Sequence, residues 1–147
     1  MNAIQPTTAE VAASFATGRH CAQCSLCPWA DALGYDEDEL LRMSAAFGGG
    51  MFHGDTCGAV TGSLMALGLA LGGSGPEVRA VMEEKTAEFQ RAFTERFGST
   101  ICRELIGYDN GIPEEHEKAV ESGILMELCP KLVCGAVEIL SGMLKDE

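Results

Sequence analysis

Seven cysteines carry most of the chemistry that this chain of 147 residues could perform. Three of them, Cys57, Cys102 and Cys129, fall at the predicted first turns of three different helices. The first turn of a helix presents free backbone N–H groups and a partial positive charge, which favour a thiolate over a thiol. Because thiolates bind metals and attack disulfides, the pattern predicts redox or metal chemistry at sulfur.

Three further cysteines form a tight run. Cys21, Cys24 and Cys27 follow the spacing C-x2-C-x2-C, and Pro28 comes directly after them. On a regular helix neighbouring members of the run lie roughly 60° apart, so all three could share one broad face, although proline disfavours helical geometry at Cys27. The spacing matches part of a bacterial ferredoxin loop but lacks the fourth cysteine of that loop. The run is therefore either a partial cluster motif or a cysteine-rich packing face.

The remaining candidate residues point to less chemistry. Cys134 lies roughly 140° around a helix from Cys129, so it is expected to be a structural core residue. The histidines are scattered at His20, His53 and His116, and each is expected to be an ordinary packed or surface side chain. The alternative for His20, next to Cys21, and for His53, four residues before Cys57, is a role as ligand or proton donor. No Ser-His-Asp or H-E-x-x-H pattern is present, so the sequence assigns no catalytic residue.

Helices must position these cysteines. N-cap residues, prolines at first turns and glycine stops predict helices at about residues 7–17, 20–33, 36–47, 56–71, 76–97 and 99–106, and onward from about residues 113 and 129. Pro28 is expected to interrupt the second of these helices. No stretch shows the alternation of a strand. The predicted fold is all-α: one domain over residues 1–147, a bundle of about six to eight helices around a central Gly/Ala-rich helix.

The bulk properties exclude several classes of function. A net charge of −12 argues against nucleic acid and anionic membrane surfaces, and it suits a basic partner protein such as a positively charged electron carrier. Residues 1–10 lack the features of a secretory signal, so a reducing cytoplasm is expected, where the cysteines are not a disulfide framework. The uncharged stretch between Asp55 and Glu77 is strongly apolar only at Leu64–Leu71, which is too short for a membrane span.

One segment carries a family resemblance. The residues from Cys57 to Gly62 read CGAVTG and match the motif CGAxxG. Together with Cys21, Cys102 and Cys129 in their local sequences, this segment resembles the C_GCAxxG_C_C family of redox-active proteins. The resemblance extends from about residue 11 to about residue 141.

The resemblance implies that Cys21, Cys57, Cys102 and Cys129 act together in redox chemistry. A similar domain occurs attached to a split-Soret type haem protein, where an iron–sulfur centre is associated with it, so the resemblance favours cluster ligation by these four residues. This chain departs from the family pattern after Cys21. Where apolar helical residues are expected it has Cys24, Cys27 and Pro28, so these two cysteines are candidate additional metal ligands or exchange partners.

Three functions compete at this point. The first is electron transfer through an iron–sulfur centre, with a redox partner that is a basic protein or a cytochrome. The second is a thiol–disulfide redox protein or sensor, in which Cys21 and Cys24 are formally a C-x-x-C pair. The third is a structural zinc module on four thiolates. The small residues between Gly58 and Ala70 also make a homodimer a candidate assembly.

Overall fold

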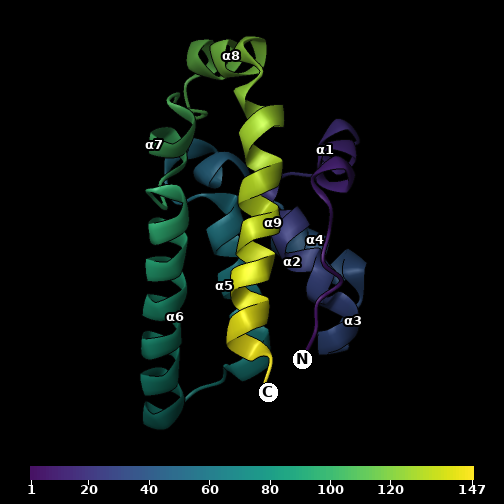
Figure 1. Cartoon of the computed structure of the whole chain (residues 1–147), viewed down its shortest axis with the longest axis vertical. Helices are drawn as coiled ribbons and strands as arrows, with labels where there is room; N and C mark the ends of the chain where they lie inside the picture. Colours follow the sequence, from purple (N-terminus) through teal and green to yellow (C-terminus); the bar gives the residue numbers. More distant parts are fainter.

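A computed structural model describes all of residues 1–147 and contains helices but no strand (Figure 1). The nearest approach to a strand is an isolated antiparallel bridge between Thr56 and Ile101. The prediction of an all-α fold is confirmed. The nine α-helices are α1 (Thr8–Ala16), α2 (Cys21–Leu26), α3 (Ala30–Leu33), α4 (Glu37–Met43), α5 (Gly58–Leu71), α6 (Pro76–Phe97), α7 (Cys102–Ile106), α8 (Pro113–Ser122) and α9 (Ile124–Leu144), with a 3-10 turn, η1 (Cys27–Trp29), and a turn with left-handed backbone angles, η2 (Gly50–Gly54).

The helix expected at residues 20–33 is divided into α2, η1 and α3. Pro28 lies in the first turn of η1, where its missing N–H costs no hydrogen bond, and the chain continues as α3 until Gly34. Gly34 has the left-handed conformation of a helix stop, with φ 73°. This division contributes to the count of nine helices, where about six to eight were expected.

Two of the predicted helix starts shift by one to three residues. Cys57 is itself the N-cap of α5, one residue after the position at which the predicted helix range begins. Cys102 is the first residue of α7, and its N-cap is Ile101. Ser99 does not cap the helix, because its hydroxyl accepts a hydrogen bond from the N–H of Ile101 at 3.0 Å. Both cysteines nevertheless lie at helix N-termini, as the sequence predicts.

The prediction that Cys129 begins the last helix is wrong. Gly123, with φ 80°, ends α8 in the left-handed conformation, and α9 starts immediately after it. Pro130 therefore lies inside α9, where it removes one backbone hydrogen bond. Burial of the apolar face of α9 outweighs this cost, since ten of its residues are buried: Cys129, Pro130, Leu132, Val133, Cys134, Gly135, Ala136, Val137, Leu140 and Leu144.

The helices α5 and α9 form the centre of the molecule. Helix α5 packs against α2, α6 and α9, and α9 also contacts α1, α2, α6, α7 and α8. Figure 1 shows α9 running through the middle, α6 along one side, α1 to α4 on the other, and α8 across one end. The largest fully buried side chains belong to this core: Trp29, Phe89, Phe93, Leu26, Leu40, Leu67, Leu132, Leu140 and Leu144. None of the helices has the length and apolar character that crossing a membrane requires.

The closest helix contact joins α2 to α5 at two glycines. A Cβ atom added to Gly58 would lie 2.7 Å from the backbone nitrogen of Ala22 and 2.9 Å from the Cβ of Cys21. A Cβ atom added to Gly62 would overlap the carbonyl oxygen of Ala22 and the hydroxyl of Ser25. These are the two glycines of the CGAxxG segment, so their role is to let α2 lie directly on α5.

We predict that Gly62→Ala lowers the free energy of unfolding by about 1–3 kcal/mol, because the added methyl group forces the two backbones apart. Gly68→Ala is the matched control in the same helix, since nothing lies within 4 Å of the added Cβ. It should be neutral or stabilise the protein by up to about 1 kcal/mol. Urea unfolding followed by circular dichroism measures both. Equal effects of the two substitutions would contradict the close contact.

Candidate functional site

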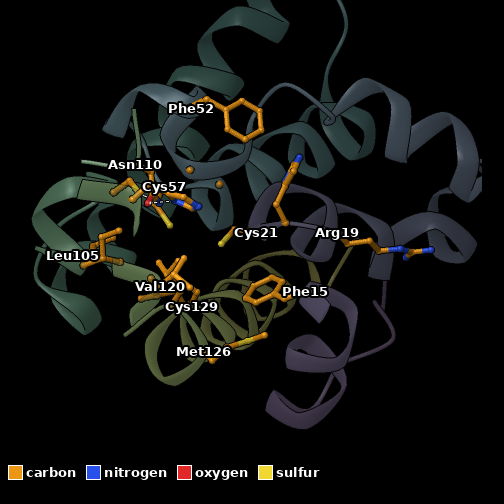
Figure 2. A pocket seen from close by; sticks show the side chains of 18 of the residues that line it. Phe15, Arg19, Cys21, Phe52, Cys57, Leu105, Asn110, Val120, Met126 and Cys129 are labelled. Carbon is orange, nitrogen blue, oxygen red and sulfur yellow. Dashed lines mark hydrogen bonds between the residues drawn. The ribbon is translucent and has the colours of Figure 1, made fainter. Parts of the chain in front are cut away.

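Four cysteines from four separate elements line one cavity. Cys21 begins α2, Cys57 caps α5, Cys102 begins α7 and Cys129 lies in the second turn of α9. The cavity has a volume of about 510 Å³, and Figure 2 shows Cys21, Cys57 and Cys129 around it. The structure thus brings together the four cysteines that the sequence singled out as a group.

The starts of α5 and α7 are tied together by backbone hydrogen bonds. The N–H of Cys57 donates to the carbonyl of Thr100 at 2.8 Å, and the N–H of Cys102 donates to the carbonyl of Asp55 at 2.6 Å. The guanidinium of Arg103 adds a bond to the Asp55 carboxylate at 3.1 Å. Cys57 and Cys102 are therefore held in a fixed relation although 45 positions separate them in the chain.

Cys21 and Cys129 form a hydrogen-bonded thiol pair. The S–H of Cys21 stabilises the thiolate of Cys129, and this bond lowers the pKa of Cys129 below its ordinary value. The same bond, together with burial, raises the pKa of Cys21. Cys129 is therefore the first of the two to lose its proton, and the Cys21 proton bridges the pair.

Burial dominates the other two thiols. It raises the pKa of Cys57 to about 12, although the backbone N–H groups of Ala59 and Val60 oppose the shift. It raises the pKa of Cys102 to about 11, with partial opposition from the side chain of Asn110. The expectation that helix N-termini would favour thiolates at these positions is outweighed by desolvation. Cys129 has a lowered pKa for a different reason, its contact with Cys21.

Asn110 and His116 belong to the cavity wall, and nothing in the sequence pattern marks them. The amide of Asn110 donates to the sulfur of Cys102 at 3.8 Å. His116 Nδ1 donates to the amide oxygen of Asn110 at 2.9 Å, which orients the amide nitrogen toward the sulfur. His116 was expected to be a surface residue, and it is exposed yet lines the cavity.

His20 and Phe52 form another part of the wall. The Nε2–H of His20 donates to the carbonyl of Ala45 at 3.0 Å, which leaves Nδ1 buried without a partner. The ring of Phe52 meets the His20 ring edge-on, with centroids 6.0 Å apart. Phe52 reaches this position from a left-handed turn, with φ 52°, that costs about 1–2 kcal/mol for a residue with a side chain. The rest of the wall is mainly apolar and includes Phe15, Leu105, Ile106, Val120, Leu125, Met126 and Leu132.

The chain matches a family model described as "Putative redox-active protein (C_GCAxxG_C_C)" over residues 19–143. The chain belongs to this family. The match includes all four cavity cysteines and confirms the resemblance seen in the sequence. No curated protein and no solved structure shows significant similarity to the chain.

In this C_GCAxxG_C_C protein the additional cysteines are not part of the four-cysteine cavity. Cys24 and Cys27 line a second, smaller hollow, so they do not share a cavity with Cys21, the first cysteine of the run. Cys134 is buried in the main core and donates its S–H to the carbonyl of Pro6 at 3.4 Å. It has the structural environment that the sequence predicts.

The donor set of the cavity suits an iron–sulfur cluster chemically, because cysteine thiolates are the ordinary ligands of such clusters. No three side chains of His, Cys, Asp or Glu meet at one point where they would hold a single metal ion. The four cysteines of the C_GCAxxG_C_C protein instead surround a volume. Binding any cation there requires the protonated thiols of Cys57 and Cys102 to lose their protons.

The raised pKa of Cys57 links stability to pH in the metal-free protein. The unfolded thiol ionises near pH 9.0, whereas the folded thiol ionises near pH 12. A raised folded-state pKa contributes stability below pH 9.0 that is lost as the pH rises toward 12. From this one thiol, the free energy of unfolding should fall by about 2 kcal/mol between roughly pH 9 and pH 11.

Urea unfolding of the reduced, metal-free protein across this pH range tests the prediction. Cys57→Ser is the control, because serine keeps the size and the N-capping ability of the residue but does not titrate. The variant should lose less stability than the wild type over this pH range, by about 2 kcal/mol. An equal loss in both proteins would contradict the assigned pKa of Cys57.

Proposed function

We propose that the protein transfers electrons through an iron–sulfur centre held by Cys21, Cys57, Cys102 and Cys129. The observation that carries this proposal is the convergence of four cysteines, from four separate elements, on one cavity with a mainly apolar wall. A cluster binds cysteines through different iron atoms, so its ligands surround a volume, as the four cysteines do around the cavity. Membership of a family described as redox-active supports the same assignment.

The surroundings of the cysteines are suited to tuning a redox centre. When bound, the cluster supplies a group that takes up and releases single electrons. Asn110 donates a hydrogen bond to the sulfur of Cys102, and such bonds to sulfur are a principal control of cluster potential. The apolar side chains of the wall limit the access of water to the sulfurs.

The edge of the cavity offers a place for a partner protein. Three of the lining side chains, Phe52, Val120 and Met126, are exposed by 57%, 56% and 51%. A net charge of −12 favours association with a basic protein, because complementary charge accelerates encounter. The redox partner in this proposal is therefore a basic electron carrier that approaches the cavity.

Anaerobic reconstitution with iron and sulfide tests the cluster. The expected product is brown and contains iron and acid-labile sulfide. Substitution of serine for each cavity cysteine should reduce the bound iron several-fold, whereas the control variant Cys134→Ser should keep it. Colourless, iron-free protein after reconstitution would contradict the proposal, and stoichiometric zinc in anaerobically prepared protein would favour a structural zinc module.

The hydrogen bond between Cys21 and Cys129 favours a second candidate function, thiol–disulfide exchange. One thiol of lowered pKa beside a second, protonated thiol is an arrangement used by dithiol redox proteins. In metal-free protein, equilibration in glutathione buffers should then produce a Cys21–Cys129 disulfide, which peptide mapping identifies. If both thiols stay fully alkylatable in the metal-free protein across all buffers, while reconstituted protein binds iron and sulfide, the disulfide function is contradicted and the cluster is not.

A further inference from the structure

Cys24 and Cys27 occupy a second hollow that the four-cysteine cavity does not include. The hollow has a volume of about 330 Å³, and its wall also contains Ser14, Arg19 and Glu37. We propose that Cys24 and Cys27 form a second redox site, a dithiol that closes to a disulfide by exchange with a small disulfide of the glutathione class. This inference does not depend on a cluster at the other four cysteines.

The backbone between the two cysteines can approach disulfide geometry. Residues three apart on a helix have Cβ atoms about 5–6 Å apart, and a disulfide requires about 3.5–4.5 Å, so the turn must tighten by roughly 1–2 Å. The chain changes from α-helix to the tighter 3-10 turn at Cys27, so the second cysteine of the pair already lies where the backbone is more tightly wound. Pro28 has no N–H, so residue 28 donates no helical hydrogen bond to the carbonyl of Cys24. Tightening the turn therefore breaks no backbone hydrogen bond donated by residue 28.

The two sulfurs differ in accessibility. Cys24 is buried, with 7% of its surface exposed, whereas Cys27 is only half-buried. Both line the hollow, and the charge of a Cys24 thiolate acts on Cys27. Cys27 is therefore the sulfur that a small disulfide reaches, and Cys24 is the thiol that resolves the mixed disulfide.

The charges around the hollow favour a stable disulfide with slow exchange. Burial raises the pKa of Cys24 and of Cys27 to about 11, while the guanidinium of Arg19 opposes the shift at both. Arg19 is paired with Glu37 at 2.6 Å, which limits its effect on the thiols. Because the protein stabilises the thiolates of Cys24 and Cys27 little, it does not favour the reduced dithiol over the disulfide. The reduction potential of the pair should therefore be low.

The exchange balances in two steps. The thiolate of Cys27 attacks one sulfur of glutathione disulfide, forms a mixed disulfide and releases one glutathione thiolate. The thiolate of Cys24 then attacks the Cys27 sulfur, forms the Cys24–Cys27 bond and releases the second glutathione thiolate. Two protein thiols are oxidised by two electrons in total, one glutathione disulfide is reduced to two glutathiones, and the two cysteine protons pass to the released thiolates through water.

Trapping experiments on the whole 147-residue chain test this site. The protein is equilibrated anaerobically in buffers of reduced and oxidised glutathione, alkylated, and digested with trypsin. Cleavage after Arg19 and Arg42 releases one peptide that holds Cys21, Cys24 and Cys27, and fragmentation locates any bond. Cys24 and Cys27 should lose their labels together, and the oxidised fraction should rise from about a tenth to about nine tenths over a roughly 100-fold change in the buffer ratio.

Matched variants separate this pair from its neighbours. Cys134→Ser should leave the disulfide unchanged, although Cys134 lies close enough to Cys24 for their charges to interact. Cys24→Ser should stop the reaction at a mixed disulfide on Cys27, and Cys27→Ser should abolish it. Circular dichroism checks that the variants fold. The trapping result for the wild-type protein tests the proposal even if a variant does not fold.

Three outcomes would overturn the proposal. The pair could remain fully alkylated in every buffer, Cys24 could bond to Cys21 or Cys134, or Cys27 could stop at a mixed disulfide in the wild type. Iron and acid-labile sulfide are also measured on the same protein preparation after anaerobic reconstitution. A protein that binds iron but forms no Cys24–Cys27 disulfide refutes only this inference, and one that forms the disulfide without binding iron refutes only the cluster.

Discussion

The direct contact of α2 with α5 at Gly58 and Gly62 is the constraint on which the rest of the structure depends. The two helix backbones can approach this closely because glycine has no Cβ atom, and a Cβ atom at either position would overlap atoms of α2. The contact places the first residue of α2, Cys21, beside the end of α5 that Cys57 caps. Ser25 reinforces it, because its hydroxyl donates to the carbonyl of Gly58 at 3.1 Å. The CGAxxG motif thus encodes a helix contact as well as a cysteine.

Burial sets the chemistry of the cavity more strongly than the helix termini do. The N-terminus of a helix carries a partial charge of only about +0.5, which stabilises a thiolate slightly. The free energy lost when the thiolate is removed from water into an apolar wall is much larger. The pKa of Cys57 is therefore raised even though the residue caps α5. Four thiolates could share this cavity only with a cation among them, because buried like charges repel each other. The site is consequently suited to two states, largely protonated thiols or metal-bound thiolates.

Much of the fold could be predicted from the sequence, and the errors have physical causes. The limits of α6 could be predicted because Pro76 and Gly98 mark them, and the break after α2 could be predicted from Pro28. The start of α9 could not, because Pro130 is of a residue type favoured at helix starts although it lies inside this helix, which begins after Gly123. The roles of Asn110 and His116 at the cavity depend on tertiary contacts, which no local pattern records.

The two proposed sulfur sites share one short helix, which carries most of the C-x2-C-x2-C run. Helix α2 has six residues, and Ala22 at its N-terminal end is in direct contact with α5, which fixes Cys21 at the cavity. Any tightening between Cys24 and Cys27 must then be absorbed toward the C-terminal end, where the chain passes into η1. Trp29, the last residue of η1, is fully buried and so fixes the chain at the end of that turn. A change at the second pair must therefore be accommodated within about one turn, between Ser25, whose hydroxyl is bonded to α5, and the buried Trp29.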